Sequence, residues 1–571
     1  MPQDAYTLRY LCEEIKVLFK GGKINRITQP SADATVFTVY TAVGVKRLCI
    51  DTNPALPRIG VSDAEERGAD KTPGNFCMLM RKHLISATIE DVSLVGFDRI
   101  VKIDLTPTAQ FFDATPKTIY AELMGRYSNL ILTSEGKVIG ANRGINFLDN
   151  NVRPLISGHT YRLPPAGEKR EPNDPALKEI FKTEADITAD KISGNVSGIA
   201  QSTAKEIAAR FFSTENAQRR NDASDGDISE KFIGFLRSFI YFSTKKPCII
   251  RENGALKDVL VYPYDTVTGE REFFDDLYLA EEKYFSEKAT AKKFAELKTR
   301  LTSITNTALK KAKKRLSAVN VRLADALTAE EDRIKGELII ANIYRIKTGD
   351  EIAVLDNYYY GTKTEIPLDK TLSPSKNAEV YYKRYNKKKR ATELLAPQKT
   401  GAEEEIAYLE SVLTEIGLAD GVDDLAAVKE ELSACGLIVQ KGRGAKKEDV
   451  LAPRVYDFLG FTVKVGRNNA ENDRLTFSAR GYDIWLHAKD YHSSHVIIET
   501  AGKEVPKKVV ELAAEVCAYY SKGRNGGKTE IVYCEKKYVK KPKGAKLGFC
   551  TYDNYKSLTV EPYIHAEDLK K

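Results

Sequence analysis

The feature that most constrains this chain is a long, highly charged helical stretch in its second half, interrupted once by a short strand-like insert. Between about residues 280 and 348, apolar residues recur at three- and four-residue steps with one break, which places them on one face of a helix. They are Phe294, Leu297, Leu301, Ile304, Leu316, Val319, Leu323 and Leu327. The insert "IAVLDNYYYGTKTEIPLD" follows, and a second helical run carries a stripe at Ile406, Leu409, Val412 and Ile416. Two helical arms that flank a small tip predict a long antiparallel coiled coil. Two ordinary amphipathic helices packed on a body are the alternative.

The sequence before the arms alternates helical and strand-like runs. A helix from Asp4 to Lys20 ends at Gly21-Gly22, and strand-like runs, the helical "NFCMLMRKHLIS" and more strand-like runs follow it. This pattern predicts an α/β domain that the chain leaves through the proline-rich "YRLPPAGEKREPNDP". Beyond it, "GNVSGIAQSTAKEIAARFF" combines a glycine turn with a helix. That outline suits a helix–hairpin–helix module, whose turn amides can face phosphates.

The last part of the chain reads as a second α/β domain. Strand-like runs ("FTVKVGR", "LTFSAR", "DIWLHA", "HVIIET") accompany one clear helix, from about Val505 to Ser521. At roughly 150 residues per domain, 571 residues correspond to three or four domains. We therefore predict a multidomain α/β plus α protein: an α/β domain at 1–170, the helix–hairpin–helix module at 171–275, coiled-coil arms with a small tip insert at 276–445, and the second α/β domain at 446–571.

Composition excludes several classes of protein. Hydrophobic residues make up 42% of the chain, which is enough for packed cores, but no window approaches the ~18 consecutive apolar residues of a membrane span. The start lacks a cationic leader followed by an apolar run, so we expect no signal peptide. The eight cysteines are scattered without a C-x-x-C pair, which indicates neither a zinc ribbon nor a disulfide scaffold. We expect a cytoplasmic protein with no membrane partner.

Positive charge is concentrated at the C-terminal end. From Leu451 to Lys571 there are 21 Lys and Arg against 15 Asp and Glu, so this part carries +6 of the net +8. The stretch "KKYVKKPKGAK" holds six lysines among an aromatic and turn residues, and Lys540, Lys541 and Lys543 lie at its centre. Clustered lysines of this kind favour a surface that binds nucleic-acid phosphates. Solubility alone is the alternative explanation.

No arrangement typical of a catalytic or cofactor site stands out. His487, His492 and His495 lack the i, i+4 spacing of a helical zinc motif, and their segment reads as strand, turn, strand. Asp483 and Asp490 could complete a metal site, but histidines satisfied within a strand and turn are commoner, so we predict no metal. We also find no nucleophile elbow, no P-loop and no dinucleotide fingerprint, and expect no cofactor. Four aromatic residues could stack on unpaired bases: Tyr482, Trp485, Tyr491 and Tyr533. At least two of them are expected in the core instead, and we expect Trp485 and His487 to build the strand scaffold of this domain.

Several of these stretches resemble the NFACT family. "GRNNAENDRLTFSARGYDIWLHAKDYHSSHVII" is similar to the signature of the NFACT RNA-binding domain, and "VKKPKGAKLGFCTYDNYKSLTVEP" to its final basic strand pair. "GFDRIVKIDL" and "YAELMGRYSNLIL" resemble hallmarks of the NFACT N-terminal domain. "DRIKGELIIANIY" and "LSPSKNAEVYYKRYNKKKRA" resemble its coiled-coil middle. The motifs span essentially the whole chain in the expected order, and the resemblance implies a glycosylase-like N-terminal fold.

The resemblance implies a role on stalled ribosomes. Family members bind large ribosomal subunits that still carry peptidyl-tRNA, recruit alanyl-tRNA, and extend the nascent chain with alanine without mRNA, which marks it for degradation. Ribosomal RNA makes the peptide bond, so no catalytic residue and no enzyme activity are expected of the chain. The resemblance also leaves room for a small RNA-binding accessory factor.

The resemblance also assigns residues. The implied tRNA-binding residues are Asp98, Arg99, Glu122 and Arg126. The implied RNA-binding residues are Arg467, Asn468, Asn469 and His495, beside Lys540, Lys541 and Lys543. Two departures are visible: His492-Ser493 replaces the usual Pro-Gly, and Asp4-Ala5 replaces Asp-Gly. The sequence therefore does not decide the conformation of these two turns.

Other functions stay open from the sequence. A DNA glycosylase of the related fold would use an N-terminal proline amine followed by Glu, whereas Pro2 is followed by Gln3 and a four-Cys zinc finger is absent from the sequence. A generic ribosome- or RNA-binding scaffold without tailing activity would not need the Asp98-Arg99 pair. A surface adhesin that binds fibronectin is suggested by names used in the family, but the sequence shows no wall-anchor motif.

Overall fold

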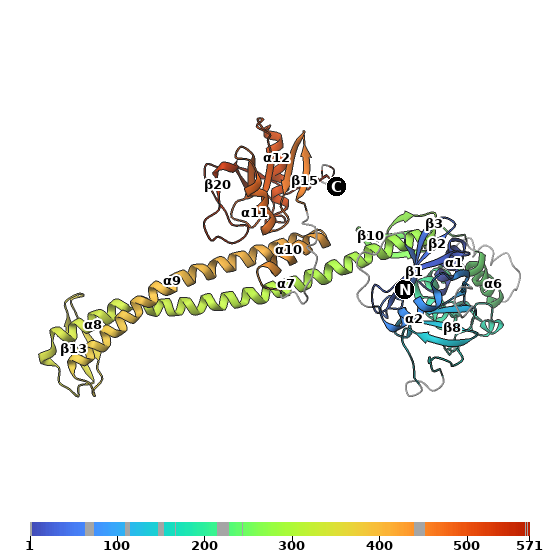
Figure 1. Ribbon diagram of the computed structural model, residues 1–571, viewed down its shortest axis with the longest axis horizontal. Coiled ribbons are helices and arrows are strands. Elements are labelled where there is room, and N and C mark those ends of the chain that lie inside the picture. The colour runs from blue at the N-terminus through green and yellow to red at the C-terminus, as the bar shows by residue number, and fades with distance from the viewer. Residues whose placement is uncertain are drawn as a thin grey trace. The chain divides into compact units, whose positions relative to one another are not determined.

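The computed structural model describes residues 3–62, 73–108, 115–146, 153–165, 167–213, 228–242, 244–438, 452–565, 567 and 569–570. The chain forms two compact units, Met1–Ala289 and Thr290–Lys571, and many of their elements are labelled in Figure 1. The four segments expected from the sequence divide the chain more finely, and their boundaries stay predictions.

The first unit is built on an antiparallel sheet. In the described residues its strand order is β4-β3-β2-β1-β5-β6-β7-β8-β9, and each neighbouring pair is antiparallel. The strands are β1 (Lys23–Thr28), β2 (Ala34–Thr41), β3 (Gly44–Asp51), β4 (Arg58–Ser62), β5 (Thr88–Leu94), β6 (Ile100–Thr106), β7 (Lys117–Glu122), β8 (Asn129–Ser134) and β9 (Lys137–Ala141). The expected α/β character is confirmed, and the helices α1 (Ala5–Phe19) and α2 (Asn75–Leu84) lie close to their predicted positions.

Helices and a small sheet complete the first unit. The helices are α3 (Ala189–Asn195), α4 (Gln201–Phe211) and α6 (Ile228–Phe242), and β10 (Cys248–Glu252), β11 (Ala255–Leu260) and β12 (Glu270–Phe273) pair in the order β11-β10-β12. One continuous apolar cluster joins α1, the large sheet, α4 and α6. The identity of α3 and α4 as a helix–hairpin–helix module stays a prediction, as does the glycosylase-like fold.

Asp4 connects α1 to the turn between α3 and α4. Its Oδ1 accepts a hydrogen bond from the Thr7 amide at 2.9 Å and so caps α1, and its Oδ2 accepts from the Ala200 amide at 3.1 Å. Gly198 has φ +70°, and its carbonyl oxygen accepts from the Ala5 amide at 2.8 Å. The turn therefore faces α1, and the Ala200 amide, which we expected to face phosphate, is bonded to Asp4.

The arms form the first half of the second unit. Helix α7 (Leu277–Leu327) begins in the first unit and is followed by α8 (Ala329–Ala341), the tip hairpin β13 (Ile352–Asn357) and β14 (Thr362–Pro367), α9 (Pro374–Leu418) and α10 (Val422–Ala434). At a rise of 1.5 Å per residue, α7 is about 75 Å long. Lys298 Nζ donates to the Gly417 carbonyl at 3.1 Å and Lys388 Nζ to Thr328 Oγ1 at 2.9 Å, so α9 runs antiparallel to α7 (Figure 1). The expected antiparallel arms and their strand-like tip are confirmed.

The C-terminal domain contains a second antiparallel sheet. In the described residues its order is β22-β19-β17-β18-β16-β15-β23. The strands are β15 (Arg454–Phe458), β16 (Phe461–Val465), β17 (Ile484–Ala488), β18 (Val496–Glu499), β19 (Thr529–Glu535), β22 (Lys556–Val560) and β23 (Leu569–Lys570), with a separate ribbon of β20 (Val539–Lys540) and β21 (Thr551–Tyr552). Helix α12 (Lys507–Tyr519) packs on the large sheet through a shared apolar cluster. The strand expected at "LTFSAR" is wrong, because residues 475–478 of this stretch belong to helix α11 (Asn469–Ser478), which Asn468 caps.

Gly198 provides a test of the contact between α1 and the α3–α4 turn. A Cβ on Gly198 would lie 2.4 Å from both Ala5 Cβ and the Phe97 carbonyl oxygen, whereas a Cβ on Gly194 would meet nothing within 4 Å. We expect Gly198→Ala to lower the free energy of unfolding by about 2–4 kcal/mol, from the positive φ and the overlap together. Gly194→Ala, the control within α3, should be neutral or slightly stabilising. Thermal unfolding measures both, and equal midpoints for the two variants would contradict the packing described.

Candidate nucleic-acid interfaces

Asp98 and Arg99 lie in the turn that joins β5 to β6, and both are partly exposed. Asp98 Oδ1 accepts a hydrogen bond from the Arg99 amide at 2.7 Å, so this carboxylate caps its own turn. The Arg99 carbonyl oxygen accepts from the Leu123 amide at 2.8 Å. This bond ties the turn to the connection between β7 and β8, which carries Arg126.

Arg126 is exposed in that connection. It belongs to a short 3-10 helix, Gly125–Tyr127, and its guanidinium lies 4.7 Å from the centre of the Tyr127 ring. Tyr127 is itself 67% exposed. The structure thus brings the turn of Asp98 and Arg99 next to a cation and an open aromatic ring, at one end of the sheet. Sequence reasoning missed Tyr127, although it directly follows the predicted arginine.

Glu122 lies in the interior and not at this surface. Its side chain is 1% exposed, forms an ion pair with Arg153, and accepts a hydrogen bond from Tyr161 Oη at 2.8 Å. Burial raises the pKa of Glu122 more than Arg153 and Tyr161 lower it. The expected surface contact of Glu122 with tRNA is therefore not available in this structure. The carboxylate instead holds the segment around Arg153 and Tyr161 against β7.

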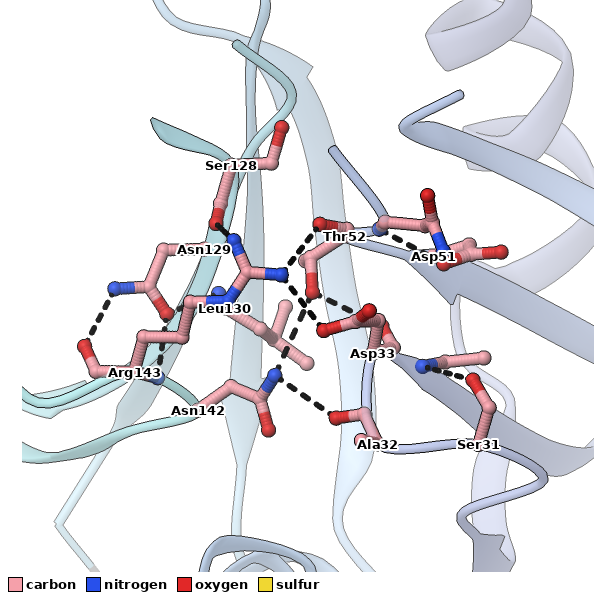
Figure 2. Close-up of polar contacts among 12 residues, drawn as sticks. Ser31, Ala32, Asp33, Asp51, Thr52, Ser128, Asn129, Leu130, Asn142 and Arg143 are labelled. Atoms are coloured by element: carbon pink, nitrogen blue, oxygen red, sulfur yellow. Dashed lines mark hydrogen bonds and ion pairs between the residues drawn. The ribbon is translucent and has the colours of Figure 1, made fainter. Parts of the chain in front are cut away.

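A second arginine fixes the base of the Arg126 connection. Arg143 Nη2 donates to Asp33 Oδ1 at 2.7 Å and to the Thr52 carbonyl at 3.2 Å, and Nη1 donates to the Ser128 carbonyl at 3.1 Å (Figure 2). Asn129 Oδ1 also accepts from the Arg143 amide at 2.9 Å. These contacts join the end of β9 to the starts of β2 and β8 and to the end of β3. The connection that presents Arg126 and Tyr127 is therefore anchored from three other parts of the sheet.

The lysine cluster forms a loop around β20 in the C-terminal domain. Lys540 and Lys543 are exposed, as a phosphate-binding surface requires. Lys541 is instead paired with Asp473, whose other oxygen accepts from the Gly548 amide at 3.1 Å. Lys541 therefore holds the loop to α11, and the charge open to a partner comes from its neighbours.

The G-R-N-N motif fastens the C-terminal domain to the helices α9 and α10. Arg467 Nη1 and Arg454 Nη2 each donate to Asp424 at 2.6 Å, one to each carboxylate oxygen. Asn469 Nδ2 donates to Ser411 Oγ at 3.0 Å and to Glu431 Oε1 at 3.2 Å. Asn468 and Asn469 are buried. The expected RNA contacts of Arg467, Asn468 and Asn469 are thus replaced by contacts within the protein.

His495 is also an interior residue. It is 1% exposed, and its Nδ1 lies 2.7 Å from Thr476 Oγ1. Burial lowers the pKa of His495 to about 3 and that of His487 to about 4, so both rings are uncharged at neutral pH. Because the ring is buried, the expected contact of His495 with RNA is not available in this structure. Trp485, which lies 5.5 Å from His487 in a stacked arrangement, is fully buried, and the scaffold role expected for both residues is confirmed.

Hydrogen bonds of both residues hold the turn in which His492-Ser493 replaces the family's usual Pro-Gly. Ser493 Oγ accepts from the Ala488 amide at 3.0 Å, and the His492 carbonyl accepts from the Lys522 amide at 2.9 Å.

Within the described ranges, no group of three or more His, Cys, Asp or Glu side chains is placed to hold a metal ion. In the same ranges, no helix combines the length and apolar composition that a membrane crossing needs.

Two family models match the chain in succession. Residues 4–450 match the NFACT N-terminal and middle domains, and residues 455–548 match the NFACT protein RNA binding domain. The chain belongs to the NFACT family. The N-terminal NFACT match contains the turn of Asp98 and Arg99, and the RNA-binding match contains the G-R-N-N motif and Lys540 to Lys543.

Relatives of this NFACT chain extend over its full length. The Rqc2 homolog RqcH of Streptococcus pneumoniae serotype 2 (strain D39 / NCTC 7466) is 31% identical over 570 residues, 98% of each chain. The Rqc2 homolog RqcH of Bacillus subtilis (strain 168) is 29% identical over 568 residues, 97% of this chain and 96% of that one. Among solved structures, the C-terminal part of the fibronectin/fibrinogen-binding protein from Streptococcus suis is 32% identical, covers 47% of this chain and 96% of that chain, and has a TM-score of 0.38.

Asp424 offers a test of how the NFACT RNA-binding domain is held. Asp424→Ala removes the carboxylate from two arginines, one of them buried, which should lower the free energy of unfolding of this domain by about 3 kcal/mol or more. Asp423→Ala, at the exposed neighbouring position in the same helical turn, is the control. Urea unfolding followed by Trp485, the single tryptophan of the chain, reports on this domain. If both variants shift the midpoint equally, the two arginine contacts do not stabilise the domain.

Proposed function

We propose that this NFACT protein acts in ribosome quality control in the cytoplasm. It binds large ribosomal subunits that carry stalled peptidyl-tRNA, recruits alanyl-tRNA, and supports mRNA-independent addition of alanine to the nascent chain, which marks that chain for degradation. The observation that carries the proposal is the similarity to RqcH proteins over 98% of the chain. Matches to both NFACT regions support it.

Exposed lysines support the ribosome part of the proposal. Lys540 and Lys543 are exposed on the C-terminal domain, and exposed lysines also follow the arms at 310–314 and 383–389. Several lysines on the arms are paired with carboxylates, such as Lys313 with Glu410 at 2.8 Å, but Lys310 and Lys311 extend from the exposed face. Point charges of this kind give affinity for the RNA backbone without reading its sequence.

The side chains at one end of the first sheet support the proposal that the protein recruits tRNA. Arg99 and Arg126 come from neighbouring connections, and an arginine can grip a phosphate with two parallel hydrogen bonds. Tyr127 offers an exposed ring on which an unpaired base can stack. Asp98 keeps the turn in shape through the Arg99 amide. We assign bond formation to ribosomal RNA, so the protein contributes binding and positioning and needs no cofactor.

The lysine loop can be tested through salt dependence. Lys540→Gln combined with Lys543→Gln should weaken binding to large subunits and reduce the slope of log affinity against log salt by about 1.5, because each lost phosphate contact removes ~0.7–0.9. Lys507→Gln with Lys508→Gln, two exposed lysines on α12, is the matched control. Filter binding over a salt series gives the slopes. An unchanged slope in the Lys540 and Lys543 variant would place the phosphate contacts elsewhere.

The turn of Asp98 and Arg99 can be tested without disturbing its fold. Asp98→Asn with Arg99→Gln keeps an oxygen that can cap the turn but removes both charges. We expect co-sedimentation with large subunits to stay unchanged, because many phosphate contacts hold the particle. Recovery of alanyl-tRNA and of alanine tails should fall by roughly 10-fold or more, since charge-assisted hydrogen bonds contribute about 1.5–3 kcal/mol each.

The control for this variant is Glu135→Gln with Lys137→Gln, an exposed acid and base in the hairpin at the other end of the same strands. It should retain both activities. Normal alanine addition by the Asp98 and Arg99 variant would show that the pair only shapes the turn.

A further inference from the structure

A cavity of about 460 Å³ lies in the second unit between α9 and the C-terminal sheet domain. Its volume falls within the range of about 300–1,000 Å³ that is usual for small-ligand sites. Three parts of the chain form its walls: Ala407 and Thr414 of α9, His487 and His492 of the sheet domain, and Lys543 and Phe549 of the lysine loop. The loop that carries the proposed phosphate contacts therefore also closes this cavity.

Part of the cavity lining is polar and uncharged, although Arg454 and Arg467, which donate to Asp424, also line it. Burial lowers the pKa of both His487 and His492, so their rings are neutral at pH 7. Burial also raises the pKa of Glu415 well above its usual range. Glu415 Oε2 is closed to solvent and has no hydrogen-bond partner among the described residues. This part of the lining suits a flat, neutral group with polar edges.

The rim of the cavity carries positive charge and an exposed aromatic ring. Lys543 and Lys546 are exposed on the loop, and Phe549 is 54% exposed beside them. Cations suit a phosphate, and an exposed ring suits stacking with a base. We propose that the cavity binds one unpaired RNA base, with the adjacent phosphate on Lys543 and Lys546. The inference rests on the proposed RNA binding and specifies that a base is bound as well as the backbone.

The first experiment distinguishes binding of an RNA base from binding of the ribose-phosphate backbone. The probes are a single-stranded RNA octamer and an octamer of the same length that lacks all bases but keeps its riboses and phosphates. The natural octamer should bind the full-length protein about 5- to 100-fold more tightly, the range expected for stacking of one base. Equal affinity for the two octamers overturns the base site but leaves phosphate binding intact. Absence of binding to either overturns both the base site and the proposed RNA binding.

A filled cavity gives the second arm of the test. Ala407→Phe adds a ring to the cavity wall without changing charge, and should lower affinity for the natural octamer to the level seen with the base-free one. Ala396→Phe, at an exposed position about three helical turns earlier on α9, should change nothing. Trp485 fluorescence confirms folding of both variants. Full affinity in a folded Ala407→Phe variant overturns the proposal.

A measurement on the unaltered protein covers the case in which Ala407→Phe fails to fold. Histidine ring resonances are followed by NMR while 5′-UMP or 5′-GMP is added. We expect shifts at His487 and His492, which line the cavity, and none at His83 or His159 of the first unit. Absence of shifts at both cavity histidines overturns the proposal.

Discussion

The architecture of the second unit depends on one buried carboxylate, Asp424, that two arginines of the C-terminal domain share. Burial alone would raise its pKa, but Arg454, the Asp420 amide and Arg467 together lower it. The stability from this site is therefore complete above the ordinary pKa of an aspartate and is lost only as the pH falls through the lowered value. Glu431 lies in the same contact with a raised pKa, so its contribution is complete at low pH and declines as the pH rises. The two acids therefore give opposite pH dependences to the contact between the C-terminal domain and helices α9 and α10.

The first unit uses a similar arrangement to hold the surface proposed to bind tRNA. Arg143 gathers an acid and two carbonyl groups from distant connections, and Glu122 is buried under Arg153 and Tyr161. These contacts leave Arg126 and Tyr127 exposed on a fixed connection. Binding to a large RNA particle needs many weak phosphate contacts, whereas selection of one tRNA needs a few well-placed groups. The two units offer surfaces that suit these two tasks.

Local pattern predicted much of this structure. Apolar spacing predicted the helical arms and α1. The helix α11 was missed because "LTFSAR" alternates like a strand, while the residue that starts the helix, Asn468, was assigned to RNA. Asn469 and His495 were placed at a surface because their motif occurs in an RNA-binding domain. Their burial depends on Ser411, 58 residues earlier, and on the fold around Thr476, and no local pattern contains such distant partners.

The central claim is that this NFACT protein holds large ribosomal subunits together with alanyl-tRNA. The most direct test is to isolate the tagged full-length protein from cells under gentle conditions and to sequence all RNA bound to it. The account predicts large-subunit ribosomal RNA in clear excess over small-subunit RNA, with alanine tRNA enriched above all other tRNAs. Equal recovery of both subunit RNAs, or a tRNA population that matches the cell's total pool, would contradict it.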